Sequence, residues 1–139
     1  MAYDVILGDD ALSALYRFLV SKNKEIGLGK ERFFKYEVSE KLSPGDYIAI
    51  NHLPFVYDNV VNEGVINVNI HCPKTAQNLP DTVKLKGYVH SILRILNDNE
   101  IYIGGCYFNL YAVSRPTKDN DDTYYVNMKF NVTYNNLKE

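Results

Sequence analysis

The side chains of this chain that could do chemistry are a pair of adjacent acids, three histidines, two cysteines and scattered serines. The neighbouring carboxylates of Asp9 and Asp10 are of the type that binds Mg²⁺ in proteins. They come directly before an apolar stripe with helical spacing, however, and acidic residues at a helix N-terminus are favoured by capping and by the helix dipole. We therefore interpret Asp9 and Asp10 as the N-cap region of a helix.

A zinc site would need histidines and cysteines at short, defined spacings. His52, His71 and His90 are far apart in the chain, and neither they nor Cys72 and Cys106 form a C-x₂-C or H-x₃-H pair. We interpret the histidines as surface residues of strands and a helix. The cysteines lie in alternating apolar runs, which is typical of small core residues in a reduced protein.

The rest of the sequence contains no recognisable catalytic or nucleotide-binding motif. No serine has a nucleophile-elbow context, and the segment 27–30 lacks the glycine spacing and the hydroxyl residue of a phosphate-binding loop. The sequence thus predicts no catalytic, cofactor or metal site, and a binding protein rather than an enzyme. The alternative is a small cytosolic ligand-binding or enzyme domain, which a deep pocket lined by His71, His90 and a carboxylate would indicate.

Length and charge limit the possible partners. The 139 residues are enough for one domain, 1–139, and the formal net charge of −2 has no basic stripe, so direct nucleic-acid binding is not expected. No apolar run approaches the ~20 residues that cross a bilayer. The first ten residues carry acids where a signal peptide would carry Lys or Arg. We therefore expect no membrane partner.

Hydrophobic periodicity predicts the elements that position these side chains. Helical spacing predicts helices over about 10–21 and 82–96, the second capped by Asp81, and alternation predicts strands over 64–72, 106–113 and 124–134. Shorter extended pieces are expected at 32–38 and 47–50. The predicted fold is α+β, with an antiparallel or mixed sheet of four to five strands and two helices packed on one face. The expected core comprises Leu15, Leu19, Ile66, Val68, Ile70, Val89, Ile92, Leu96, Phe108, Leu110, Val126, Met128 and Phe130.

Tyrosine is unusually frequent, with twelve tyrosines and no tryptophan. Many fall at positions that the alternation assigns to the side of the sheet away from the core. Exposed tyrosines are enriched where proteins contact proteins, but tyrosine is also a good strand former, and both explanations stay open. The loop 115–122 is expected to be a solvated hairpin tip. The candidate subunit-interface residues are Tyr107, Tyr111, Tyr125, Arg115, Lys118, Asp119, Asp121 and Asp122.

The order of these elements resembles that of the tail terminator proteins of tailed phages, and more loosely that of other neck and tail-completion proteins. The resemblance rests on the first helix, the strand Gly64 to Pro73, the helix Val83 to Leu96 and the closing hairpin with Tyr124 to Val132. It implies an α+β protomer that assembles as a ring, usually a hexamer, and contacts neck, connector or tail-tube proteins. It also implies a place in the virion, at the tail or neck, after assembly in the host cytoplasm. A bacterial adaptor domain without a viral role is a third interpretation.

Overall fold

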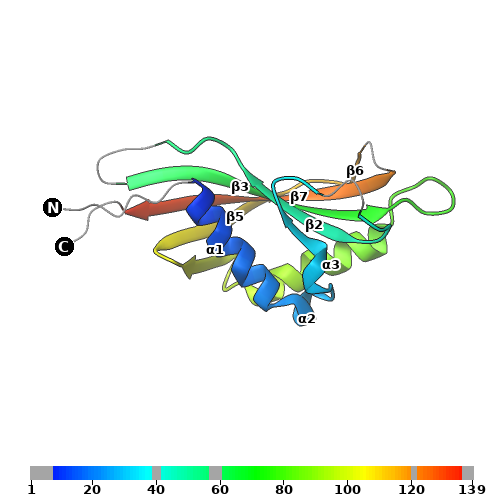
Figure 1. Cartoon of the computed structure of the whole chain (residues 1–139), viewed down its shortest axis with the longest axis horizontal. Coiled ribbons are helices and arrows are strands. Elements are labelled where there is room, and N and C mark those ends of the chain that lie inside the picture. The colour runs from blue at the N-terminus through cyan, green and yellow to red at the C-terminus, as the bar shows by residue number, and fades with distance from the viewer. Residues whose placement is uncertain (1–7, 39–41, 57–60, 120–121, 136–139) are drawn as a thin grey trace.

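Two paired strands of thirteen residues each, β3 (Val61–Pro73) and β7 (Thr123–Asn135), form the middle of the sheet (Figure 1). The structure is a computed structural model that describes residues 8–38, 42–56, 61–119 and 122–135. The two strands are antiparallel and in register along their whole length, with Ile66 opposite Phe130 and Val68 opposite Met128. Their β-branched and aromatic residues suit such extended pairing.

The remaining strands extend the sheet to both sides in the order β1-β2-β3-β7-β5-β4. On one side β2 (Tyr47–His52) is antiparallel to β3, and the edge strand β1 (Phe33–Lys35) is parallel to β2. On the other side lie β5 (Cys106–Val113) and the edge strand β4 (Glu100–Ile103), while β6 (Thr117–Lys118) pairs with β7 beyond the end of β5. The sheet is mixed and strongly curled, like a half-barrel.

The sheet therefore has more strands than the four to five that the sequence predicts, because seven are present in the described residues. The missed strands are β4 and β6, which have four and two residues and too little alternation to stand out. β4 exists because Gly104 and Gly105, both with positive φ, form a tight hairpin turn that folds it back onto β5.

The predicted alternation of β5 fails at one point. A bulge between Leu110 and Ala112 shifts the register, so that Leu110 lies opposite Phe130 but Ala112 lies opposite Lys129. An extra residue in one strand moves the following side chains to the other face. Ala112 therefore leaves the core face to which the alternation had assigned it.

Two main helices, α1 (Gly8–Ser21) and α3 (Thr82–Ile95), lie on the same side of the sheet (Figure 1). The short helix α2 (Asn23–Ile26) and the 3₁₀ turn η1 (Lys30–Arg32) connect α1 to β1. The predicted cap of α3 is confirmed, since the Lys84 N–H donates to Asp81 Oδ1 at 3.2 Å. The predicted place of Asp9 and Asp10 at the N-terminus of α1 is confirmed, since both lie in its first turn. Neither is the cap, because the helix already includes Gly8. No helix among the described residues is long and apolar enough to cross a membrane.

The core lies between the helices and the sheet, and the predicted core set is confirmed with one adjustment. All of its members are buried except Val89, which is partly buried against the others. The sheet contributes the even-numbered residues of β3 and β7, and the helices contribute residues such as Leu12, Leu15 and Ile92. The odd-numbered residues of β3 and β7 point to the other side, which we call the helix-free face.

Replacing Phe130 with Ala should lower the free energy of unfolding by about 3–5 kcal/mol, because its fully buried ring fills the centre of this core. Urea denaturation followed by circular dichroism measures the change. The matched control is Asn131→Ala, at an exposed position of the same strand. A similar small loss for both variants would contradict the register described above.

Candidate functional site

A polar groove of about 500 Å³ lies on the helix-free face, above β3 and β7. Its floor is formed by odd-numbered residues of the two strands, and its wall by residues of the segment 114–119, which contains β6. Among the described residues, no aliphatic side chain lines it. The lining residues are Asn67, Asn69, His71, Ser114, Thr117, Asp119, Tyr125, Asn127 and Lys129.

One end of the groove is a row of three stacked rings on neighbouring strands. The His71 ring lies between Tyr47, with ring centroids 4.4 Å apart, and Tyr125, with centroids 5.2 Å apart. His71 Nδ1 is 3.1 Å from Thr123 Oγ1 and 3.6 Å from Asp119 Oδ2. His71 is therefore only 6% exposed, and its prediction as a surface residue is wrong. The two cross-strand rings and the wall segment bury it, and these contacts form only when distant strands pair.

The rest of the floor is a connected set of asparagine amides. Asn127 Nδ2 donates to Asn69 Oδ1 at 2.7 Å and to Asn67 Oδ1 at 3.2 Å, and Asn67 Nδ2 donates to Asn51 Oδ1 at 2.9 Å. Lys129 Nζ donates to Asn67 Oδ1 at 3.0 Å and lies at the other end of the groove. These bonds fix the amide orientations, so the groove presents a preorganised set of polar groups.

The predicted candidates for chemistry do not converge, apart from His71 and a carboxylate. His90 is exposed on α3, which packs on the opposite face of the sheet, and His52 Nδ1 contacts Leu53 O at 2.8 Å. The described residues contain no group of three or more His, Cys, Asp or Glu side chains that could hold a metal ion. The combination of His71, His90 and a carboxylate therefore does not form, but His71 and Asp119 do share a groove.

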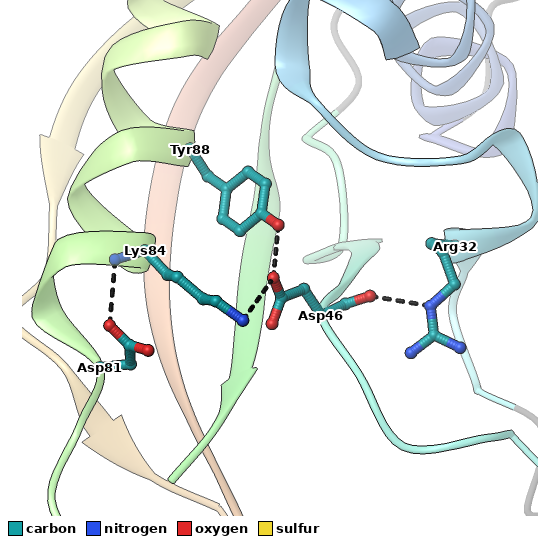
Figure 2. A network of polar contacts seen from close by, with 5 residues as sticks. All are labelled: Arg32, Asp46, Asp81, Lys84 and Tyr88. Atoms are coloured by element: carbon teal, nitrogen blue, oxygen red, sulfur yellow. Dashed lines mark hydrogen bonds and ion pairs between the residues drawn. The ribbon is translucent and has the colours of Figure 1, made fainter. Parts of the chain in front are cut away.

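A second polar cluster, around Asp46, lies between α3 and the start of β2 (Figure 2). Asp46 follows the Pro44-Gly45 turn, and its side chain is 11% exposed. Its Oδ2 accepts a hydrogen bond from the Tyr88 hydroxyl and is 3.6 Å from Lys84 Nζ. Its main-chain oxygen accepts from Arg32 Nε at 2.8 Å. The cluster thus ties α3, β2 and the η1 turn together.

Burial and the Asp46 charge keep the groups of this region protonated. Burial, followed by the nearby Asp46 charge, raises the pKa of the Cys72 thiol. Burial, followed by the hydrogen bond to Asp46, raises the pKa of Tyr88. Burial also raises the pKa of Cys106 to about 11. Because the thiolate is the reactive form of cysteine, neither thiol is a nucleophile at neutral pH. Both cysteines are buried and unlinked, as the sequence predicts.

The predicted interface residues are divided between the groove and the solvent. Tyr125 and Asp119 line the groove, while Tyr107 is half-buried on the helix-free face opposite Tyr102. Tyr111, Arg115 and Lys118 are exposed, and so is Asp122, whose Oδ1 is 3.5 Å from Lys74 Nζ. Asp121 lies outside the described residues.

Sequence reasoning missed the asparagines, Lys129 and Asp46. A signal for the first group exists, because Asn67 and Asn69 on one strand and Asn127 and Lys129 on the other recur with a period of two on the polar side. Asp46 is marked only by its place between a turn and an apolar strand.

Comparison with known proteins supports the fold and gives no information about function. The sequence matches no protein-family model and no curated protein sequence. A solved structure, of a protein whose name states no function, matches with a TM-score of 0.63 and 16% identity, over 91% of this chain and 94% of the other. At this identity the likeness shows only a shared α+β architecture, a curled mixed sheet with two main helices.

Replacing Tyr88 with Phe should destabilise the protein by about 1–3 kcal/mol, because it removes a hydroxyl donor from a largely buried carboxylate. Chemical denaturation measures the loss. Tyr102→Phe, at an exposed tyrosine, is the control and should change stability by less than about 0.5 kcal/mol. If both variants lose the same free energy of unfolding, the hydrogen bond between Tyr88 and Asp46 does not stabilise the protein.

Chelator treatment should leave the melting temperature unchanged, since the sequence predicts no metal site. Addition of ATP should also have no effect. A ligand that binds only the native state must raise the melting temperature of the protein. Differential scanning fluorimetry therefore detects a bound metal ion or bound ATP. A drop of several degrees with a chelator, or a rise with ATP, would refute the prediction.

Proposed function

We propose that this protein is a structural subunit of a tailed-phage virion, a tail terminator or a related neck or tail-completion protein. In this proposal it forms a homo-oligomeric ring, a hexamer in the resembled family, at the head-proximal end of the tail. Its partners are then copies of itself and the adjoining neck, connector or tail-tube proteins. Assembly takes place in the host cytoplasm, and the mature location is the virion.

The observation that carries this proposal is that large apolar side chains are exposed near both ends of the strand order, at the β1 edge and at the β4 edge. The β1-side patch consists of Tyr36, Leu53 and Val56, the last 71% exposed. We call the exposed residues near the β4 edge the β4-side patch: Tyr102, which is 72% exposed and lies opposite Tyr107, and Tyr111 and Val113 farther along β5, with Val113 opposite Met128 and so on the other face from Tyr102. Tyrosines and other large apolar side chains at a sheet edge are available for contacts with another subunit.

Two different surfaces are what a ring requires. A ring forms when one surface of each subunit binds a different surface of the next and the rotation closes. The strands β1 and β4 are at opposite ends of the sheet order, and an edge strand presents unpaired backbone groups that favour pairing with another chain. The two patches adjoin these two edges. Their arrangement therefore supports head-to-tail contacts between copies.

Light scattering and native mass spectrometry over a range of concentrations test the proposal. The wild type should form a closed ring, and Tyr102→Ser or Val56→Ser should weaken assembly at least about tenfold, because interface energy is concentrated in a few large side chains. The control is Val83→Ser, which removes an 82%-exposed apolar residue of α3 outside both patches and should assemble normally.

Mixing the two patch variants makes the test sharper. Each variant keeps one intact patch, so an equimolar mixture of Tyr102→Ser and Val56→Ser should give heterodimers without rings. Circular dichroism of each variant controls for folding. A wild-type protein that stays monomeric at every concentration, alone and with neck, connector and tail-tube proteins, would refute the ring.

The second candidate function is a small ligand-binding domain. It is favoured by the polar groove, where His71 and Asp119 lie 3.6 Å apart beside a fixed set of amides. A volume of about 500 Å³ is within the range of small-molecule sites. Saturable binding of a small molecule by the monomer would favour this function over a purely structural one.

A further inference from the structure

The outward side of α3 carries a stripe of exposed residues. Its members recur at three- and four-residue spacings, which places them on one side of the helix: Val83, Lys86, Gly87, His90 and Arg94. Val83 is 82% exposed, and the other four are exposed as well. The opposite side of the helix, with Leu85 and Ile92, is buried in the core. We call the five exposed residues the α3 stripe.

The α3 stripe is basic although the chain as a whole is acidic. The helix contains Lys84, Lys86 and Arg94 and no Asp or Glu, whereas the formal net charge of the chain is −2. Lys84 belongs to the Asp46 cluster, with its Nζ 3.6 Å from Asp46 Oδ2. Among the described residues, no carboxylate lies within ion-pair distance of Lys86 or Arg94. These two residues are eight positions apart, or about 12 Å along the helix axis.

Gly87 lies in the middle of the α3 stripe, and the fold gives no reason for a glycine there. Glycine destabilises a helix interior relative to alanine, because its backbone loses more conformational freedom on folding. A Cβ atom at Gly87 would meet no atom within 4 Å, and Gly87 is not among the glycines with positive φ. The distance between two packed helices depends on the side chains at the contact, so a glycine lets a second helix approach closely.

We propose that the α3 stripe binds a helix of another protein whose facing side carries Glu or Asp at four-residue spacing. Its carboxylates pair with Lys86, His90 and Arg94, which recur every four residues. Gly87 lets the two helices approach closely, and Val83 packs against an apolar residue at the end of the acidic stripe. A crossing angle of about 20° keeps two helices in contact over this length.

Charge complementarity favours this occupant over two others. A second copy of α3, packed on the first by a two-fold axis, would place basic side chains opposite basic side chains. A nucleic acid would be held by phosphate contacts alone, and strong phosphate binding needs more basic residues than the stripe supplies. The exposed Val83 would also gain nothing beside a phosphate, whereas it can pack on an apolar side chain of a helix.

This inference goes beyond the proposed ring and does not depend on it, since the α3 stripe lies outside both edge patches. Val83→Ser should therefore leave ring assembly unchanged and weaken only the binding of the acidic helix. Loss of the ring in Val83→Ser would make α3 a contact between copies and would refute the inference.

Fluorescence anisotropy with labelled helical peptides tests the acidic pattern. The probe is an alanine-rich peptide of about 20 residues, with three Glu at four-residue spacing and a Leu one turn beyond them. The control peptide has the same composition, with the three Glu on different sides of the helix. The patterned peptide should bind at least about fivefold more tightly, and salt should weaken its binding. Titrations of wild type and of Tyr102→Ser separate loss of the ring from loss of peptide binding.

Variants of the stripe test its charges and its glycine. The double variant Lys86→Gln with Arg94→Gln should bind the patterned peptide about tenfold more weakly. Lys118→Gln, which removes an exposed base of β6, is the control and should bind like wild type. Gly87→Leu should also weaken binding about tenfold, because its side chain blocks the close approach. The same variant should raise the melting temperature by about 2–5 °C, since leucine is the better helix former.

Three further results would overturn the proposal. The first is absence of binding by the patterned peptide at about 1 mM. The second is equal binding of the control peptide, or tighter binding of double-stranded DNA, either of which would show that the stripe attracts polyanions in general. The third is a lower melting temperature of Gly87→Leu, which would show that the fold itself requires this glycine.

Discussion

The rest of the structure depends on the register of β3 with β7, which pairs thirteen residues of each strand. Successive side chains of a strand point to opposite faces, so this one register sends Ile66, Val68 and Phe130 into the core and Asn67 and Lys129 to the helix-free face. A slip by one residue would place the asparagines in the core and the core residues in water. The stability of the protein and the composition of the groove thus have the same physical origin.

Asp46 provides a second constraint, because it fixes how α3 sits against the sheet. A largely buried carboxylate is costly unless its partners are in place, and here Tyr88 and Lys84 both come from α3. The cluster therefore favours one position of the helix over others. With both main helices on one face of the sheet, the other face stays open, and the groove lies there.

The surfaces proposed for assembly and for ligand binding lie on different parts of the molecule. The exposed apolar patches adjoin the edge strands β1 and β4, while the groove lies over the middle pair, β3 and β7. A contact made at the edges leaves the groove accessible, so the two proposed functions are compatible. The shared architecture with a solved structure at 16% identity says nothing about either function, because one fold can support many sites.

The sequence by itself determined the two main helices, the approximate positions of five of the seven strands and almost the whole core, because periodicity reports which side chains must avoid water. It also marked Cys72 and Cys106 as small core residues. It gave eight interface candidates, of which the structure describes seven, without deciding their surroundings. Only tertiary structure decided that β4 and β6 join the sheet, that a bulge turns Ala112 outward, and that His71 is buried beside Asp119. His71 and Asp119 are forty-eight residues apart in the chain. Such contacts depend on which strands become neighbours, and a local pattern carries no information about that choice.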